Sequence, residues 1–198
     1  MSDYSHLEER LAAREVIILD GAIGTQLQSM GAPMAEFAWA ALALDTHPFT
    51  VRHMHENYIA AGVDIITTNS YASARHNLEP LGLGERTAEL NLRAVMLAQD
   101  ARDKAARDRP VLIAGSVSNF GIKVGQEPGM DRWSMARRRS ETSEAQAKAN
   151  LREQADILAE AGVDFLISES TGGNNHRQWV VEACLSTGLP VWDGFKCR

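Results

Sequence analysis

The chain has 198 residues, of which 44% are hydrophobic and 23% are charged, and its net charge at pH 7 is −6. This composition is typical of a folded globular protein and excludes a chain that is disordered throughout. The acidic balance argues against nucleic acid and anionic membranes as partners, since both are negatively charged. The longest apolar stretch, 37–44, is far shorter than the ~20 residues that a membrane-spanning helix needs.

The N-terminal residues and the cysteines indicate where the chain works. Residues 1–16 are charged and lack the apolar core of a signal peptide. The sequence contains two cysteines, Cys184 and Cys197, which are too few for a disulfide framework. We therefore expect a reduced, cytoplasmic protein.

Helical and strand patterns alternate along the whole chain. A short N-terminal helix is followed by predicted strands and helices in turn, and the tetrad Ala-Gly-Val-Asp occurs twice, at 61–64 and 161–164. Gly62 and Gly162 each fit the left-handed position that ends a helix. The expected strands are 16–19, 111–114, 191–195 and the buried runs that begin at 65 and 165, directly after the two tetrads. The expected helices between them are 48–59, 85–107, 144–160 and 178–185.

Apolar strands flanked by helices predict an α/β fold with a parallel sheet covered on both faces, in one domain that spans 1–198. Polar residues follow the strands, including Asp20, Asn69, Ser116 and Glu169. Carboxyl ends of parallel strands share one edge of the sheet, where ligands bind in such folds. Each of these residues alone is equally well interpreted as a helix cap or a solvated loop residue, but together they favour one site.

Several collinear blocks cover almost the whole chain and carry a family resemblance: 18–25, Trp39, His55, 58–71, 91–95, 114–116, 161–169 and 189–192. Together they resemble the homocysteine S-methyltransferases, a family that includes betaine–homocysteine and S-methylmethionine-dependent enzymes. The resemblance implies a (β/α)₈ barrel, of which about five strands are present here, so that the barrel is truncated after about the fifth strand.

The same resemblance assigns roles to individual residues. Asp20 orients the substrate and Glu169 takes the ammonium group of homocysteine, while backbone amides of Gly21, Gly24 and Thr25 help to hold its carboxylate. Asn69, Tyr71, Trp39 and Ser116 complete the expected substrate-binding set. Tyr71 and Trp39 line the pocket of a cationic methyl donor, for which aromatic faces are suited, although core packing is the slightly favoured reading of Trp39.

Two departures from the family pattern affect these expectations. The stretch 115–120 reads Gly-Ser-Val-Ser-Asn-Phe, where many members have Gly-Pro followed by Tyr. The family is expected to use zinc, held by three cysteines in Gly-x-Asn-Cys and Gly-Gly-Cys-Cys stretches that do not occur in this sequence. No metal ligand is therefore assigned, and Cys184 is expected to be a packed thiol in a helix.

Two hypotheses remain open. The first is the N-terminal part of a homocysteine S-methyltransferase that makes methionine from homocysteine and a small methyl donor, inactive alone and unable to bind zinc tightly. The second is a non-catalytic remnant that binds amino acids or serves assembly. Because five strands leave two apolar sheet edges unpaired, we also expect self-association through those edges.

Overall fold

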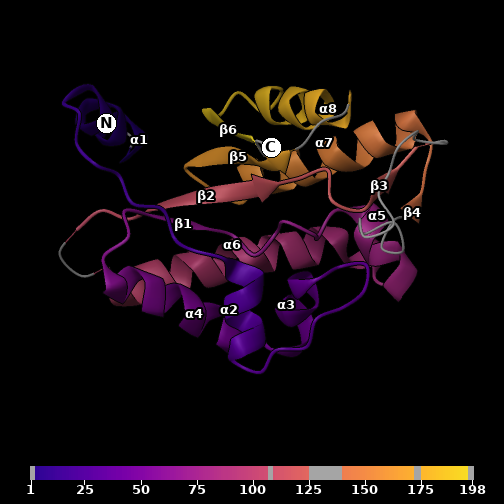
Figure 1. The fold of residues 1–198 in the computed structure, drawn as a ribbon, viewed down its shortest axis with the longest axis horizontal. Helices are drawn as coiled ribbons and strands as arrows, with labels where there is room; N and C mark the ends of the chain where they lie inside the picture. Colours follow the sequence, from indigo (N-terminus) through magenta and orange to yellow (C-terminus); the bar gives the residue numbers. More distant parts are fainter. Residues whose placement is uncertain (1–2, 107–108, 125–139, 172–174, 196–198) are drawn as a thin grey trace.

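The computed structural model describes residues 3–106, 109–124, 140–171 and 175–195 (Figure 1). Helices and strands alternate through these ranges, and the repeat of strand and helix in the sequence is visible in their order. The helices are α1 (Asp3–Ala12), α2 (Ile23–Ser29), α3 (Ala43–Thr46), α4 (Pro48–Ala61), α5 (Arg75–Leu78), α6 (Thr87–Ala105), α7 (Glu144–Glu160) and α8 (Asn175–Leu185), with short 3₁₀ turns η1 (Ala40–Leu42), η2 (Glu79–Leu81) and η3 (Gly84–Arg86). The strands are β1 (Ile65–Thr67), β2 (Leu112–Val117), β3 (Ile122–Lys123), β4 (Ser140–Glu141), β5 (Phe165–Thr171) and β6 (Val191–Phe195).

Four strands form the main sheet, and all of their pairings are parallel. The order is β1-β2-β5-β6, with Ile66 beside Ile113, Gly115 beside Leu166 and Ile167 beside Trp192. The predicted α/β fold with a parallel sheet is therefore confirmed. None of the described helices combines the length and the apolarity that crossing a bilayer requires.

Both faces of this sheet are buried, as its nearly continuous apolar strands predict. Alternate strand residues point to opposite faces. On one face, which we call the outer face, Ile66, Ile113 and Leu166 pack with α4, α6, α7 and α8. On the opposite or inner face, Ile65, Leu112 and Phe165 pack together and against α1. Figure 1 shows α6 running along the sheet beside β1 and β2.

The repeated Ala-Gly-Val-Asp tetrad has one structural role at both places. Gly62 and Gly162 have φ of 102° and 88°, the left-handed conformation that ends α4 and α7. The aspartate that follows each glycine then accepts a backbone N–H of the neighbouring segment: Asp64 from Ile18 and Asp164 from Ile113. The tetrad thus ends a helix and joins the next strand to its neighbour.

Helix α1 covers the inner face near the amino-terminal ends of the strands (Figure 1). Leu7 is fully buried, and the Tyr4 ring lies 5.5 Å from that of Phe165. The indole of Trp192 in β6 donates to the Tyr4 hydroxyl at 3.0 Å. This helix therefore links both ends of the described chain and leaves the opposite end of the sheet for a site.

The predicted strand at 16–19 is wrong. The segment runs beside β1, but its pairing is a single parallel bridge between Leu19 and Ile65. Val16 is 80% exposed and Ile18 51% exposed, because no described strand lies on their outer side. Pairing on one side over so few residues does not complete a strand.

Other expectations differ in detail. Helix α7 has the predicted bounds, α4 extends two residues past the prediction, and α8 begins three residues earlier than predicted. A second, two-stranded sheet is formed by β3 and β4, and residues 125–139 between them lie outside the described residues.

Candidate active site

Two cavities open at the carboxyl-terminal ends of the strands, and Glu169 of β5 lines both. We call them the aromatic cavity, of about 220 Å³, and the acidic cavity, of about 270 Å³. The aromatic cavity is lined by Ala22, Ile23, Gly24, Thr25, Trp39, Ala40, Ala41, Thr68, Asn69, Tyr71, Ala72 and Glu169. The acidic cavity is lined by Leu19, Asp20, Gly21, Ile23, Thr67, Ile167, Glu169 and Gly194.

Asp20 lies in the acidic cavity and is held by one residue at the end of β1. Its carboxylate accepts the backbone N–H of Thr67 at 2.8 Å and the Thr67 hydroxyl at 2.9 Å. The pKa of Asp20 is raised to about 7, chiefly by burial and in smaller part by the charge of Glu169, while the hydrogen bonds from Thr67 oppose this rise. The side chain is therefore able to hold or release a proton near neutral pH.

Glu169 is fixed by Ser116, which was expected to contact substrate. The Ser116 hydroxyl is fully buried and donates to Glu169 Oε2 at 2.5 Å. Burial raises the pKa of Glu169, and the bond from Ser116 opposes that shift. Ser116 is not among the residues that line either cavity, so its contact with the site is through Glu169.

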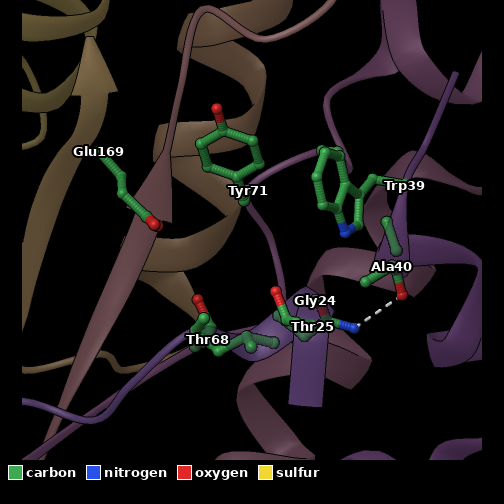
Figure 2. Close-up of a pocket in the computed structure, with 12 residues that line it drawn as sticks. Gly24, Thr25, Trp39, Ala40, Thr68, Tyr71 and Glu169 are labelled. Atoms are coloured by element: carbon green, nitrogen blue, oxygen red, sulfur yellow. Dashed lines mark hydrogen bonds between the residues drawn. The ribbon is translucent and has the colours of Figure 1, made fainter. Parts of the chain in front are cut away.

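Tyr71 and Trp39 form an aromatic wall of the aromatic cavity, and Phe120 packs against both of them. The Phe120 ring lies 5.4 Å from that of Tyr71 and 6.1 Å from that of Trp39, which it meets edge to face. In Figure 2 Tyr71 stands between Glu169 on one side and Trp39 on the other. Burial, followed by the charge of Glu169, raises the pKa of Tyr71 to about 12, so its hydroxyl stays neutral.

Trp39 lines the cavity, although core packing was the slightly favoured expectation for it. Its backbone has φ of 40°, which is unusual for a residue with a side chain, and its carbonyl accepts the N–H of Ala35. The indole lies against Gly24, where a Cβ atom would stand 2.1 Å from Nε1 of the ring. Close approach to Trp39 is therefore the physical reason for a glycine at position 24.

Replacing Gly24 with alanine should displace the Trp39 ring and lower the free energy of unfolding. Such overpacking costs about 1–3 kcal/mol, which urea denaturation measures directly. The double variant Gly24→Ala/Trp39→Phe removes the clashing nitrogen and should regain part of this loss relative to Trp39→Phe alone. Equal losses with and without the indole would show that the contact is not the cause.

The remaining predicted residues lie in two segments, the one that follows Asp20 and the loop that follows β1. Gly21 lines the acidic cavity beside Tyr58, while Gly24 and Thr25, in the first turn of α2, line the aromatic one. Asn69 donates from Nδ2 to the carbonyl of Ala40 at 3.0 Å (Figure 2). The structure therefore brings all of the predicted residues except Ser116 to the lining of two adjoining cavities.

The described residues do not fit the zinc ion that the resemblance implies. A zinc site needs about four N, S or O ligands, and no cluster of three or more His, Cys, Asp or Glu side chains suited to a metal exists in the described part of the chain. Cys184 is fully buried in α8, where burial, with a further contribution from the charge of Asp193, raises the pKa of its thiol to about 12. Cys197 lies outside the described residues.

Comparison with known proteins shows the family of the chain. The family model described as homocysteine S-methyltransferase matches residues 17–198. The chain belongs to the homocysteine S-methyltransferase family. Relatives in this family include the selenocysteine methyltransferase of Astragalus bisulcatus, 28% identical over 100% of this chain and 62% of that protein. The homocysteine S-methyltransferase of Escherichia coli (strain K12) is 29% identical over 100% of this chain and 64% of the other.

Solved structures of the family share the fold. The homocysteine methyltransferase MmuM from Escherichia coli, in its metallated form, matches with a TM-score of 0.75 and 25% identity, over 95% of this chain and 66% of that one. The oxidized form matches with a TM-score of 0.73. The sheet described above thus corresponds to part of the fold of these enzymes, and the chain spans less than two thirds of the length of these relatives.

Sequence reasoning missed three residues of the site. Thr67 holds Asp20, Thr68 lines the aromatic cavity, and Phe120 packs against Tyr71 and Trp39. The polar run 67–71 at the end of a strand was the available signal for the two threonines. Phe120 had no such signal, because the loop that returns it to Tyr71 and Trp39 has no regular periodicity.

Proposed function

We propose that this chain forms the substrate-binding part of a homocysteine S-methyltransferase, in which homocysteine and a positively charged methyl donor meet beside Glu169. The observation that supports this most strongly is that Glu169 lines two cavities of different character. One contains a second carboxylate, Asp20, and the other contains the aromatic wall. Two such sites side by side are what transfer between two amino-acid-like molecules requires.

The ammonium group of homocysteine would bind in the acidic cavity. An ammonium donates up to three hydrogen bonds, and Glu169 and Asp20 offer carboxylate oxygens on either side of one space. Charge-assisted bonds of this kind are stronger than neutral ones. Ser116 and Thr67 would hold the two acceptors in place while the ligand binds.

The methyl donor would occupy the aromatic cavity. The faces of Trp39 and Tyr71 attract a sulfonium or quaternary ammonium group, because ring quadrupoles are negative at the face. The homocysteine sulfur would then attack the methyl carbon, forming the new S–C bond of methionine as the bond from carbon to the donor heteroatom breaks. Activating the thiol requires a group that removes its proton. The metal ligands that the family uses for this purpose do not lie among the described residues.

Glu169→Gln tests the proposal. Loss of one charge-assisted contact costs roughly 1.5–3 kcal/mol, so the affinity for L-homocysteine should fall about tenfold or more in calorimetric titration under reducing conditions. Glu160→Gln, an exposed residue at the end of α7, serves as the matched control and should bind as the parent chain does. Failure of the parent chain to bind L-homocysteine would contradict the function. Equal affinity of the Glu169→Gln variant would contradict the assignment of the site.

We further propose that residues 1–198 act as one domain and work in the cytoplasm, where a substrate thiol stays reduced. A non-catalytic amino-acid-binding chain is the alternative function. Such a chain would bind homocysteine in the acidic cavity but would not bind tetramethylammonium, a mimic of the cationic methyl donor.

Self-association through the exposed edge at 16–19 is expected as well. Val16 and Ile18 are 80% and 51% exposed, and unpaired apolar edges favour pairing between chains. Size-exclusion chromatography with light scattering should give a mass above the 21.7 kDa of one chain. The variant Val16→Lys/Ile18→Lys should shift the chain towards the monomer, whereas a parent chain that is monomeric at every concentration would contradict this expectation.

A further inference from the structure

A cluster of buried amides and hydroxyls lies behind the aromatic cavity, between α6, α7 and the loop 68–73. Its members are Gln154 of α7, Asn91 of α6, Ser70 and Ser73, which we call the amide–hydroxyl cluster. All four are 0% exposed. Burying an amide is unfavourable unless its hydrogen bonds are made, so a polar group at each of these positions calls for an explanation.

The cluster supplies donors to the loop 68–73. This loop follows β1 at the point where sheet pairing ends, so its carbonyl groups need other partners. Gln154 Nε2 donates to the Ser70 carbonyl at 2.6 Å, with longer contacts to Ser73 Oγ and Asn91 Oδ1. Asn91 Nδ2 donates to the Ser73 carbonyl at 2.9 Å, and the Ser73 hydroxyl reaches Asn91 Oδ1 at 2.6 Å.

The loop 68–73 contributes to the site in two ways. Thr68, Asn69 and Tyr71 line the aromatic cavity from it. On its other side, the Ser70 hydroxyl donates to the Ser116 carbonyl at 2.7 Å, and Ser116 in turn donates to Glu169. A continuous path of hydrogen bonds therefore runs from Gln154 through Ser70 and Ser116 to Glu169.

The burial of Gln154 is energetically unfavourable in a way that packing alone does not explain. Its Oε1 atom is buried and has no hydrogen-bond partner among the residues that the structure describes, while Nε2 is surrounded by acceptors. An unpaired buried acceptor is unfavourable, and an apolar side chain of the same length would avoid it. The donor to Ser70 is the feature that such a side chain would lose.

We propose that Gln154 is a positioning residue, which sets the place of Tyr71 and Glu169 in the site by holding the Ser70 carbonyl. This role rests on the proposed function. It adds a residue on an outer helix that touches neither cavity to the set that determines binding.

Fluorine NMR of the chain labelled with 3-fluorotyrosine tests this role. The sequence has three tyrosines, Tyr4, Tyr58 and Tyr71, so three resonances are expected. The resonance that is missing from the Tyr71→Phe variant belongs to Tyr71. In Gln154→Met the Tyr71 resonance should shift or broaden while that of Tyr4, which lies on α1, stays in place. The affinity for L-homocysteine should fall by roughly three- to tenfold, because Glu169 loses part of its support.

Asn150→Leu is the matched control. Asn150 lies one turn earlier on α7 and is 2% exposed, and its Oδ1 accepts from Gln146 Nε2 at 2.8 Å. Among the described residues it makes no hydrogen bond to the loop 68–73. It should leave the Tyr71 resonance and the affinity unchanged. If Gln154→Met does not fold, Ser73→Ala removes one hydroxyl of the cluster and should move the Tyr71 resonance in the same way by a smaller amount.

Three results would overturn the proposal: an unchanged Tyr71 resonance in the folded variants, unchanged homocysteine affinity despite a shifted resonance, or equal effects from Asn150→Leu. Because the resonance is measured in the free chain, it reports on the cluster even where homocysteine does not bind the parent chain. Failure of this proposal and failure of the proposed function are therefore distinguishable.

Discussion

Asp20→Asn should stabilise the folded chain at pH 8 by about 2–4 kcal/mol and leave its stability nearly unchanged at pH 4. The pKa of Asp20 is about 7 in the folded chain against an ordinary value of 3.8, chiefly because the side chain is buried. As the pH rises between these values, the unfolded chain releases a proton that the folded chain keeps. The folded state consequently loses stability up to about pH 7, and the full cost remains above it.

The asparagine side chain preserves the local geometry and removes the charge. Its oxygen accepts the N–H of Thr67, and its NH₂ group donates to the Thr67 hydroxyl, which takes the place of the present contacts. Urea denaturation at pH 4 and pH 8 measures the difference, with Asp100→Asn, an exposed residue on α6, as the control. Equal free energies of unfolding for the parent chain and Asp20→Asn at pH 8 would show that the charge of Asp20 does not destabilise the folded chain. A gain together with weaker homocysteine binding would show a site maintained at the expense of stability.

Acidification should destabilise the chain through two buried histidines. His55 and His76 are 0% and 1% exposed, and burial lowers the pKa of each to about 4, an effect that the Phe120 carbonyl partly offsets at His76. Since the unfolded chain binds these protons near pH 6.5, stability is lost as the pH falls from there towards 4. Each histidine accounts for about 3 kcal/mol at the lower limit.

His55→Leu isolates one half of this effect. Neither ring nitrogen of His55 has a hydrogen-bond partner in the described part of the chain, so leucine removes the buried polar atoms together with the titration. Between pH 7 and pH 4.5 the variant should lose markedly less free energy of unfolding than the parent chain. Phe49→Leu, on the same helix and 74% exposed, changes no titratable group and should keep the parent's pH dependence. Identical slopes for all three chains would rule out His55 as a source of acid sensitivity.

The sequence was most informative where one local signal determines one feature. The glycines at 62 and 162 mark the ends of α4 and α7, because only a left-handed residue continues the chain there. The helical periodicity of 144–160 gives the bounds of α7 without error. Nearly continuous apolar runs were enough to identify the strands that are buried on both faces.

Features that depend on neighbours distant in sequence were harder to predict. The segment 16–19 has the composition of a strand, but a strand also needs partners, and its outer side has none among the described strands. Ser116 lies near the end of β2, yet its hydroxyl donates to Glu169 and the residue lines neither cavity. Phe120 and Gln154 act through loop and helix packing that no sequence period encodes.

The contact between Glu169 and the ammonium group of homocysteine is the central claim, and a thermodynamic cycle tests it most directly. Calorimetry would compare L-homocysteine with 4-mercaptobutanoate, which lacks the amino group, on the parent chain and on Glu169→Gln. If the contact exists, the parent chain prefers homocysteine by about tenfold or more and the variant loses most of that preference, a coupling of roughly 1.5–3 kcal/mol. An equal preference in both chains would contradict the account.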